Sequence, residues 1–106
     1  MNESRQVAVV TAAAGVGIGS SIAEKLADDG FDVVITDIHE RRSNETAQRF
    51  SEQFDREFLS IPLDVASEDS VKSAVDQIID QRGRIDVLVN NAGWSKIEPV
   101  AEMSLE

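Results

Sequence analysis

Three glycines, Gly15, Gly17 and Gly19, stand at alternate positions between a short apolar run and a segment with helical periodicity. A turn without side chains lets an anion approach the backbone closely, and the N–H groups and positive dipole end of the following helix face that anion. The pattern therefore predicts a diphosphate-binding turn. A tight turn with close helix–strand packing is the structural alternative, and the glycines taken alone leave both open.

The carboxylate of Asp37 is placed to select the sugar of an adenine dinucleotide. It ends the apolar segment 32–37, about 20 residues after the glycines. A carboxylate there accepts hydrogen bonds from a ribose 2′-hydroxyl and repels a 2′-phosphate, which favours NAD over NADP. Arg41 and Arg42 leave a second interpretation open, because one of them could reach a 2′-phosphate. They are equally plausible as solvated residues at a helix start.

A diphosphate turn needs a strand before it and a helix after it, and the chain supplies this order repeatedly. Segments rich in Val, Ile and Leu alternate with helical patterns. Ser67 is placed to cap a helix, and Gly30 and Gly83 are placed to end helices. The predicted strands are 7–10, 32–37, 57–65 and 85–91, and the predicted helices cover about 18–29, 40–53 and 68–82.

Nearly continuous apolar strands are typical of a parallel sheet that helices cover on both faces. We predict an α/β fold with a doubly wound parallel sheet of the Rossmann type. The sheet is partial, with four strands in the order 3-2-1-4 and three crossover helices. The apolar stripes of the first and third helices are formed by Ile18, Ile22 and Leu26, and by Val71, Val75, Ile78 and Ile79.

Composition limits the classes of function. The 106 residues fit one domain, 1–106, and the net charge of −10 excludes the basic surface that nucleic-acid binding requires. No apolar run is long enough to span a bilayer, which predicts no membrane partner. The chain has no cysteine, and its first six residues are polar. These features predict a cytoplasmic protein.

Four features in this order make the chain resemble the short-chain dehydrogenase/reductase family, from about Gln6 to its last residue. They are the glycine turn, Asp37, the segment LDV at 63–65 and the segment NNAG at 90–93. The resemblance implies NAD(P)(H)-dependent hydride transfer between a nicotinamide cofactor and a small carbonyl or alcohol substrate. NAD is the expected cofactor, with NADP second.

The resemblance also implies roles for matching positions. Asp37 would hold the adenosine ribose, and Asp64 and Val65 would flank the adenine, with Asp64 bonding its amino group. Asn90 would tie its strand to the sheet. The whole set of implied cofactor-binding residues is Gly15, Val16, Gly17, Ile18, Gly19, Asp37, Asp64, Val65, Asn91, Ala92 and Gly93.

The chain departs from the family pattern in two places. The first glycine of the pattern Thr-Gly-x-x-x-Gly-x-Gly is an alanine here, Ala12 or Ala13 according to the alignment, so we expect Gly15 to make the tight turn. The family's catalytic Tyr, Lys and Ser lie beyond the fourth strand, and this chain has no tyrosine. We therefore expect an N-terminal half, truncated before the catalytic segment, with no catalytic residue and no metal site.

Two consequences follow from that expectation. The alternative function is a non-catalytic nucleotide-binding or self-associating fragment. The strand at 85–91 would form an edge of the sheet, and unpaired edges are templates for pairing. We expect a homodimer or higher oligomer through this edge, or a C-terminal tail that folds back over it, with Trp94 at the contact.

Overall fold

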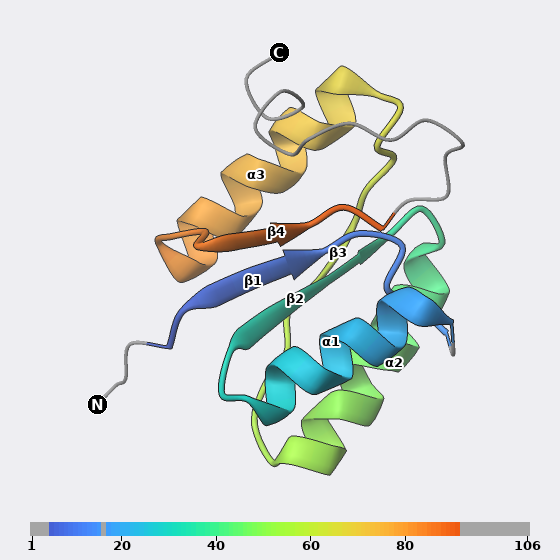
Figure 1. Ribbon diagram of the computed structural model, residues 1–106. Helices are drawn as coiled ribbons and strands as arrows, with labels where there is room; N and C mark the ends of the chain where they lie inside the picture. Colours follow the sequence, from blue (N-terminus) through green and yellow to red (C-terminus); the bar gives the residue numbers. More distant parts are fainter. Residues whose placement is uncertain (1–4, 16, 92–106) are drawn as a thin grey trace.

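The computed structural model describes residues 5–15 and 17–91. Within these residues a parallel sheet has the order β3-β2-β1-β4, and three helices connect its strands (Figure 1). The predicted α/β class and strand order are confirmed. The elements are β1 (Val7–Val10), α1 (Ile18–Asp28), β2 (Asp32–Asp37), α2 (Glu40–Phe54), β3 (Ser60–Pro62), α3 (Glu68–Arg82) and β4 (Val87–Val89).

The two outer strands are shorter than the apolar runs that predicted them. β3 and β4 have three residues each, whereas the runs covered 57–65 and 85–91. An outer strand has one neighbour, so its length is the length of that one pairing. β4 pairs with β1 only from Ala8 to Val10, and β3 pairs with β2 only from Ile35 to Asp37.

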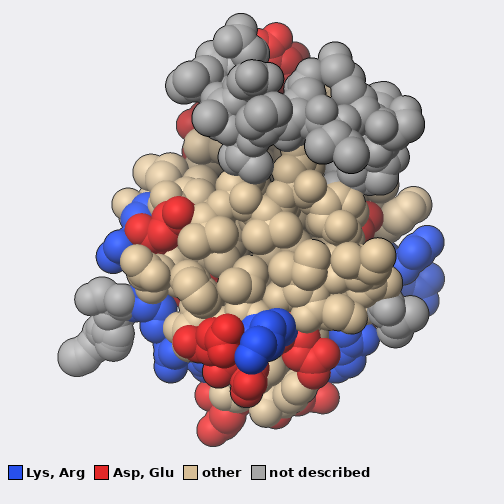
Figure 2. Space-filling model, in the orientation of Figure 1, with Lys and Arg blue, Asp and Glu red and all other residues tan. Residues whose placement is uncertain are grey.

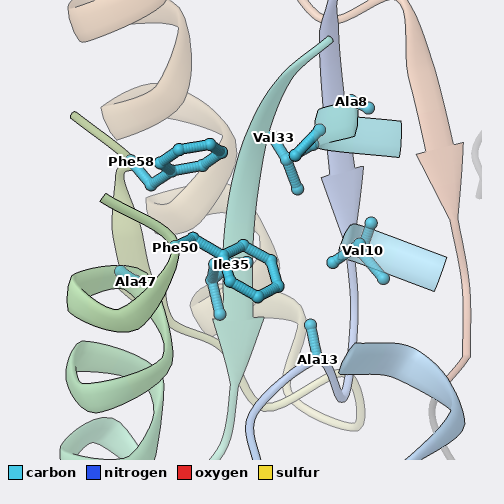
Figure 3. Packing of buried hydrophobic residues seen from close by; sticks show 10 residues of the cluster. Ala8, Val10, Ala13, Val33, Ile35, Ala47, Phe50 and Phe58 are labelled. Atoms are coloured by element: carbon cyan, nitrogen blue, oxygen red, sulfur yellow. The ribbon is translucent and has the colours of Figure 1, made fainter. Parts of the chain in front are cut away.

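Alternate residues of the central strands contact different helix layers, as the period of a strand requires. Val10 and Ile35 belong to the cluster that contains Ala47 and Phe50 of α2, whereas Val34 belongs to the cluster beneath α3. Figure 3 shows the side chain of Phe50 lying against Ile35, with Phe58 beside Val33. The sheet is therefore the middle layer of three, with α1 and α2 on one face and α3 on the other (Figure 1).

The buried face of α1 is not the predicted stripe of large side chains. Ile18 is 73% exposed, and Ile22 and Leu26 are half-buried. The buried positions of this helix are small, Gly19, Ser20, Ala23 and Ala27. Small side chains let the helix axis approach the sheet closely, and the large side chains then lie at the sides of the contact.

The stripe predicted for α3 is also wrong in part. Ala74 and Ile78 are buried, but Val71, Val75 and Ile79 are 36–45% exposed. The ends of this helix agree with prediction, since Ser67 Oγ accepts a hydrogen bond from the N–H of Ser70 and Gly83 ends the helix at φ 81°. In the described part of the chain, no helix combines the length and apolar character needed to cross a bilayer.

Candidate dinucleotide site

The predicted site residues collect at one edge of the sheet. Because all four strands are parallel, the residues that follow them lie at their carboxyl ends, on the same side. Between β1 and β4 the connections depart in opposite directions, and ligands of open α/β sheets bind at such a switch point. Three predicted residues, Val16, Ala92 and Gly93, lie outside the described residues.

We call the segment from Thr11 to Gly17 the glycine loop, and two of its described residues have left-handed backbone conformation. Gly15 has φ 86°, as expected for the residue that makes the tight turn. Ala12 has φ 52°, a region that non-glycine residues enter at a cost of about 1–3 kcal/mol. The loop thus keeps a left-handed turn directly after Thr11, where the family pattern has a glycine.

Gly17 and Gly19 serve different purposes. A Cβ added at Gly19 would collide with the carbonyl oxygen of Ala12 and would lie 2.6 Å from Nδ2 of Asn91, so a side chain is excluded there. Gly17 caps α1 in extended conformation, and no heavy atom of the described residues lies within 4 Å of its potential Cβ. Close packing explains Gly19, whereas no described residue beyond its chain neighbours crowds the Cβ position of Gly17.

The start of α1 has backbone donors that lack an acceptor inside the helix. The first hydrogen bond within the helix runs from the N–H of Ser21 to the carbonyl of Gly17. The N–H groups of Ile18, Gly19 and Ser20 precede it and so have no partner within the helix. The first turn carries no acidic side chain that would compete for them. These donors and the helix dipole fit an anionic diphosphate.

Asp37 is bound into the glycine loop. Its side chain is almost completely buried, with 9% exposed. Oδ2 accepts a hydrogen bond from the N–H of Ala14 at 3.1 Å, and Oδ1 accepts one from the N–H of His39, also at 3.1 Å. Each carboxylate oxygen can accept a further bond. Asp37 therefore joins β2 to the loop, in addition to any role toward a ribose.

Thr11 joins β1 to β4 at the switch point. Its hydroxyl oxygen accepts the N–H of Asn91 at 2.8 Å and donates to Oδ1 of Asn90 at 3.1 Å. The N–H of Thr11 also donates to the carbonyl of Val89 at 3.0 Å. The side chain of Asn90 thus makes the connection between strand and sheet that was expected of it.

Asp64 and Val65 follow β3 at the same edge of the sheet. Oδ1 of Asp64 accepts the N–H of Ala66 at 3.0 Å, and the Asp64 N–H donates to Oγ of Ser70 at 2.9 Å. Val65 is partly buried against the cluster beneath α3. Both residues are half-buried.

Two contacts to the glycine loop come from α2 and were not predicted. Thr46 Oγ1 accepts the N–H of Gly15, and Arg49 donates to the carbonyl of Gly15 and to Oγ of Ser20. The sequence signal was weak, because these residues lie in a polar helix far from the glycines along the chain. Across residues 5–15 and 17–91, no three acidic or histidine side chains converge as a metal site would require.

Comparison with known proteins agrees with this geometry. The sequence model of the family described as short chain dehydrogenase matches residues 6–106. The chain therefore belongs to the short-chain dehydrogenase family.

Individual relatives come from several bacteria. L-2,3-butanediol dehydrogenase of Corynebacterium glutamicum is 41% identical over 103 residues, which are 95% of this chain and 39% of that protein. A short chain dehydrogenase from Mycobacterium smegmatis is 42% identical, with a TM-score of 0.81 over 92% of this chain and 40% of that one. An L-sorbose reductase from Gluconobacter frateurii, solved with NADPH and L-sorbose, is 35% identical with a TM-score of 0.80 over 93% and 37%. The chain spans about two fifths of the length of these relatives.

Proposed function

We propose that this chain is the cofactor-binding part of an NAD(P)(H)-dependent oxidoreductase that interconverts a carbonyl and an alcohol. The observation that carries the proposal is the side-chain-free position at Gly17, next to the first N–H groups of α1, which have no partner within the helix. Family membership supports an oxidoreductase over the alternative of a non-catalytic binding fragment.

Different residues bind different parts of the cofactor in this proposal. The N–H groups of Ile18, Gly19 and Ser20 hold the diphosphate, and Gly15 and Gly17 leave room for it. Asp37 holds the adenosine ribose, and Asp64 and Val65 border the adenine. Asn91, Ala92 and Gly93 border the remainder of the cofactor, and Val16 belongs to the cofactor-binding turn. When bound, the nicotinamide supplies hydride transfer, and the residues above position it.

We propose NAD(H) as the preferred cofactor because Asp37 puts a carboxylate at the end of β2. A shallow hollow of about 540 Å³ beside it is lined by Ile38, His39, Glu40, Arg41, Arg42 and Glu45. The guanidinium of Arg41 lies 3.3 Å from the carboxylate of Glu45, on the exposed surface of α2. NADPH in the sorbose reductase complex makes NADP(H) the alternative to be tested.

Titration of the chain with NADH and with NADPH, side by side in a calorimeter, tests both parts of the proposal. We expect binding of both, with NADH the tighter. In Gly17→Ala a methyl group would hold the diphosphate away from the helix start, removing about one charged hydrogen bond. We expect NADH binding to weaken roughly 10- to 100-fold.

Gly19→Ala is the matched control for Gly17→Ala. The backbone of residue 17 has φ −85°, which alanine adopts without strain, and no described residue beyond its chain neighbours lies within 4 Å of the added Cβ. The melting temperature of Gly17→Ala should therefore stay close to that of the parent chain. Gly19→Ala should lower the melting temperature clearly, because its Cβ collides with backbone. Equal NADH affinity in Gly17→Ala and the parent, or no binding of either dinucleotide, would contradict the cofactor site. Tighter binding of NADPH would overturn the role of Asp37.

We further propose self-association through β4 and α3. Leu88 of β4 and Val71, Val75 and Ile79 of α3 are exposed apolar side chains. In Figure 2 the described surface in front of β4 and β1 is uncharged, and charged side chains lie toward its margins. The average molar mass in solution should therefore rise with protein concentration, and at a given concentration it should be lower for Leu88→Lys than for the parent chain. A strict monomer at high concentration would refute this.

A cytoplasmic location stays a prediction.

A further inference from the structure

The glycine loop is held from outside by the second and third turns of α2, a helix that is remote from it in sequence. Thr46 and Arg49 lie one helical turn apart on α2, and both contact Gly15. Arg49 also contacts Ser20, in the first turn of α1. α2 therefore touches both sides of the open entry at Gly17.

Thr46 determines the orientation of the Gly15 peptide. Its side chain is buried, with 3% exposed, and Oγ1 accepts the N–H of Gly15 at 2.9 Å. This amide is consequently engaged within the protein and does not face a ligand in this conformation. The left-handed φ of Gly15 gives a flexible residue one defined state, because a buried acceptor fixes its N–H.

Arg49 connects the loop to the helix that follows it. Its Nη2 donates to the carbonyl of Gly15 at 3.3 Å and to Oγ of Ser20 at 2.9 Å. The guanidinium also lies 5.4 Å from the ring centre of Phe50, which is fully buried. The cation thus bridges two segments between which the diphosphate entry lies.

We propose that Thr46 and Arg49 are positioning residues for the diphosphate, which they hold in place through the glycine loop without touching it. The inference rests on the proposed cofactor function. A loop that is ordered before binding does not lose that freedom when the ligand arrives, so preorganisation raises affinity. The effect is specific to ligands that carry a diphosphate, because Thr46 and Arg49 act on the loop that surrounds it.

Two variants of Thr46 separate positioning from packing. Thr46→Val keeps the branched shape and removes the acceptor, whereas Thr46→Ser keeps the hydroxyl. ADP and adenosine are the probes, titrated against the parent chain and both variants. We expect Thr46→Val to weaken ADP binding roughly 5- to 30-fold and Thr46→Ser to restore most of it. Adenosine binding should be unchanged in both variants.

Arg49→Met is the second test, because Arg49 is exposed and its loss does not open the core. It should weaken ADP binding in the same direction and leave adenosine unaffected. Equal ADP affinity in the parent, Thr46→Val and Arg49→Met would overturn the positioning role and leave the proposed cofactor site standing. Equal loss of adenosine and ADP would show a general structural role and would also overturn it. Absence of ADP and NADH binding in the parent chain would refute the proposed function itself.

Discussion

The two faces of the sheet are covered in different ways. Beneath α1 and α2, the rings of Phe50, Phe54 and Phe58 contact one another with centroids 5.6–6.0 Å apart, and Phe50 is fully buried. On the other face, α3 contributes the small Ala74 and one large side chain, Ile78, to the core. The remaining apolar side chains of α3 are exposed.

The difference shows which face of the sheet is fully covered by the described residues. The face under α1 and α2 is closed, and the same α2 supplies Thr46 and Arg49 to the glycine loop, so packing and site support are one structure. α3 is attached through the packing of Ala74 and Ile78 and, near its C-terminal end, by the ion pair between Arg82 and Asp32. Its exposed stripe suits contact with a further apolar surface.

Removing a ring from the closed face should have the largest effect. Phe50→Ala deletes a fully buried aromatic side chain and should lower the free energy of unfolding by about 3–5 kcal/mol, measured by urea denaturation. The matched change on the open face is Ile79→Ala, in a side chain that is nearly half exposed. It should cost less than about 1 kcal/mol, because little apolar area is lost from the core.

A similar loss of stability in both variants would break this comparison, since it would mean that α3 is packed as fully as α2. Dilute protein is needed for the measurement, because Ile79 belongs to the surface proposed to self-associate. Any loss in Ile79→Ala that grows with concentration reports the interface and not the fold.

The ion pair of α3 should have the next largest effect. Arg82 Nε lies 2.8 Å from Oδ2 of Asp32, and both side chains are less than one fifth exposed. Arg82→Ala would leave a half-buried carboxylate whose Oδ1 already has no partner among the described residues. We expect a loss of about 1.5–3 kcal/mol in the free energy of unfolding.

The control for Arg82→Ala is Arg41→Ala, which removes a pair with Glu45 on the open surface of α2. Exposed pairs of this kind contribute about 0.3–0.5 kcal/mol. If the two variants were equally stable, the Arg82 pair would not contribute to holding α3 on the sheet.

The sequence predicted the parts that follow from local pattern. The strand order, the cap at Ser67 and the helix end at Gly83 were all foreseen. The wrong assignments concern which side of a helix is buried, because Ile18 and Ile79 satisfy an apolar period while the backbone approaches the sheet through small residues. The spacing of apolar residues along a helix does not indicate how closely that helix approaches the sheet.

The candidate site also has parts that the sequence predicts and parts that it does not. The glycine loop and Asp37 were predictable, since each follows an apolar strand at a recognisable spacing. The support from Thr46 and Arg49 was not predictable, because it depends on tertiary contacts across about 30 residues of chain. Nor does a motif distinguish Gly17 from Gly19, whose different roles follow from the atoms that surround each one.

The smallest expected effect concerns the edge strand β4, and it depends on pH. Asp86 lies just before β4, and Oδ2 accepts the N–H of Val7 at 2.8 Å while both carboxylate oxygens accept from Arg84. The hydrogen bonds from Arg84, and then from Val7, hold the pKa of Asp86 below the ordinary value of 3.8. Its charged form is thus favoured in the folded chain, and the stability it contributes is present above pH 3.8.

That contribution is lost as the pH falls through the lowered pKa of folded Asp86. In Asp86→Asn the acid-dependent part disappears, so the melting temperature should drop less steeply than in the parent between about pH 4 and pH 2. Asp76→Asn, on the exposed side of α3, is the control for loss of one negative charge. Parallel curves for the parent and Asp86→Asn would mean that the Asp86 carboxylate adds nothing to the backbone pairing and the Thr11 hydrogen bonds that join β4 to β1. Asp86 would then contribute no electrostatic attachment to this edge strand, whereas the Arg82 pair attaches α3.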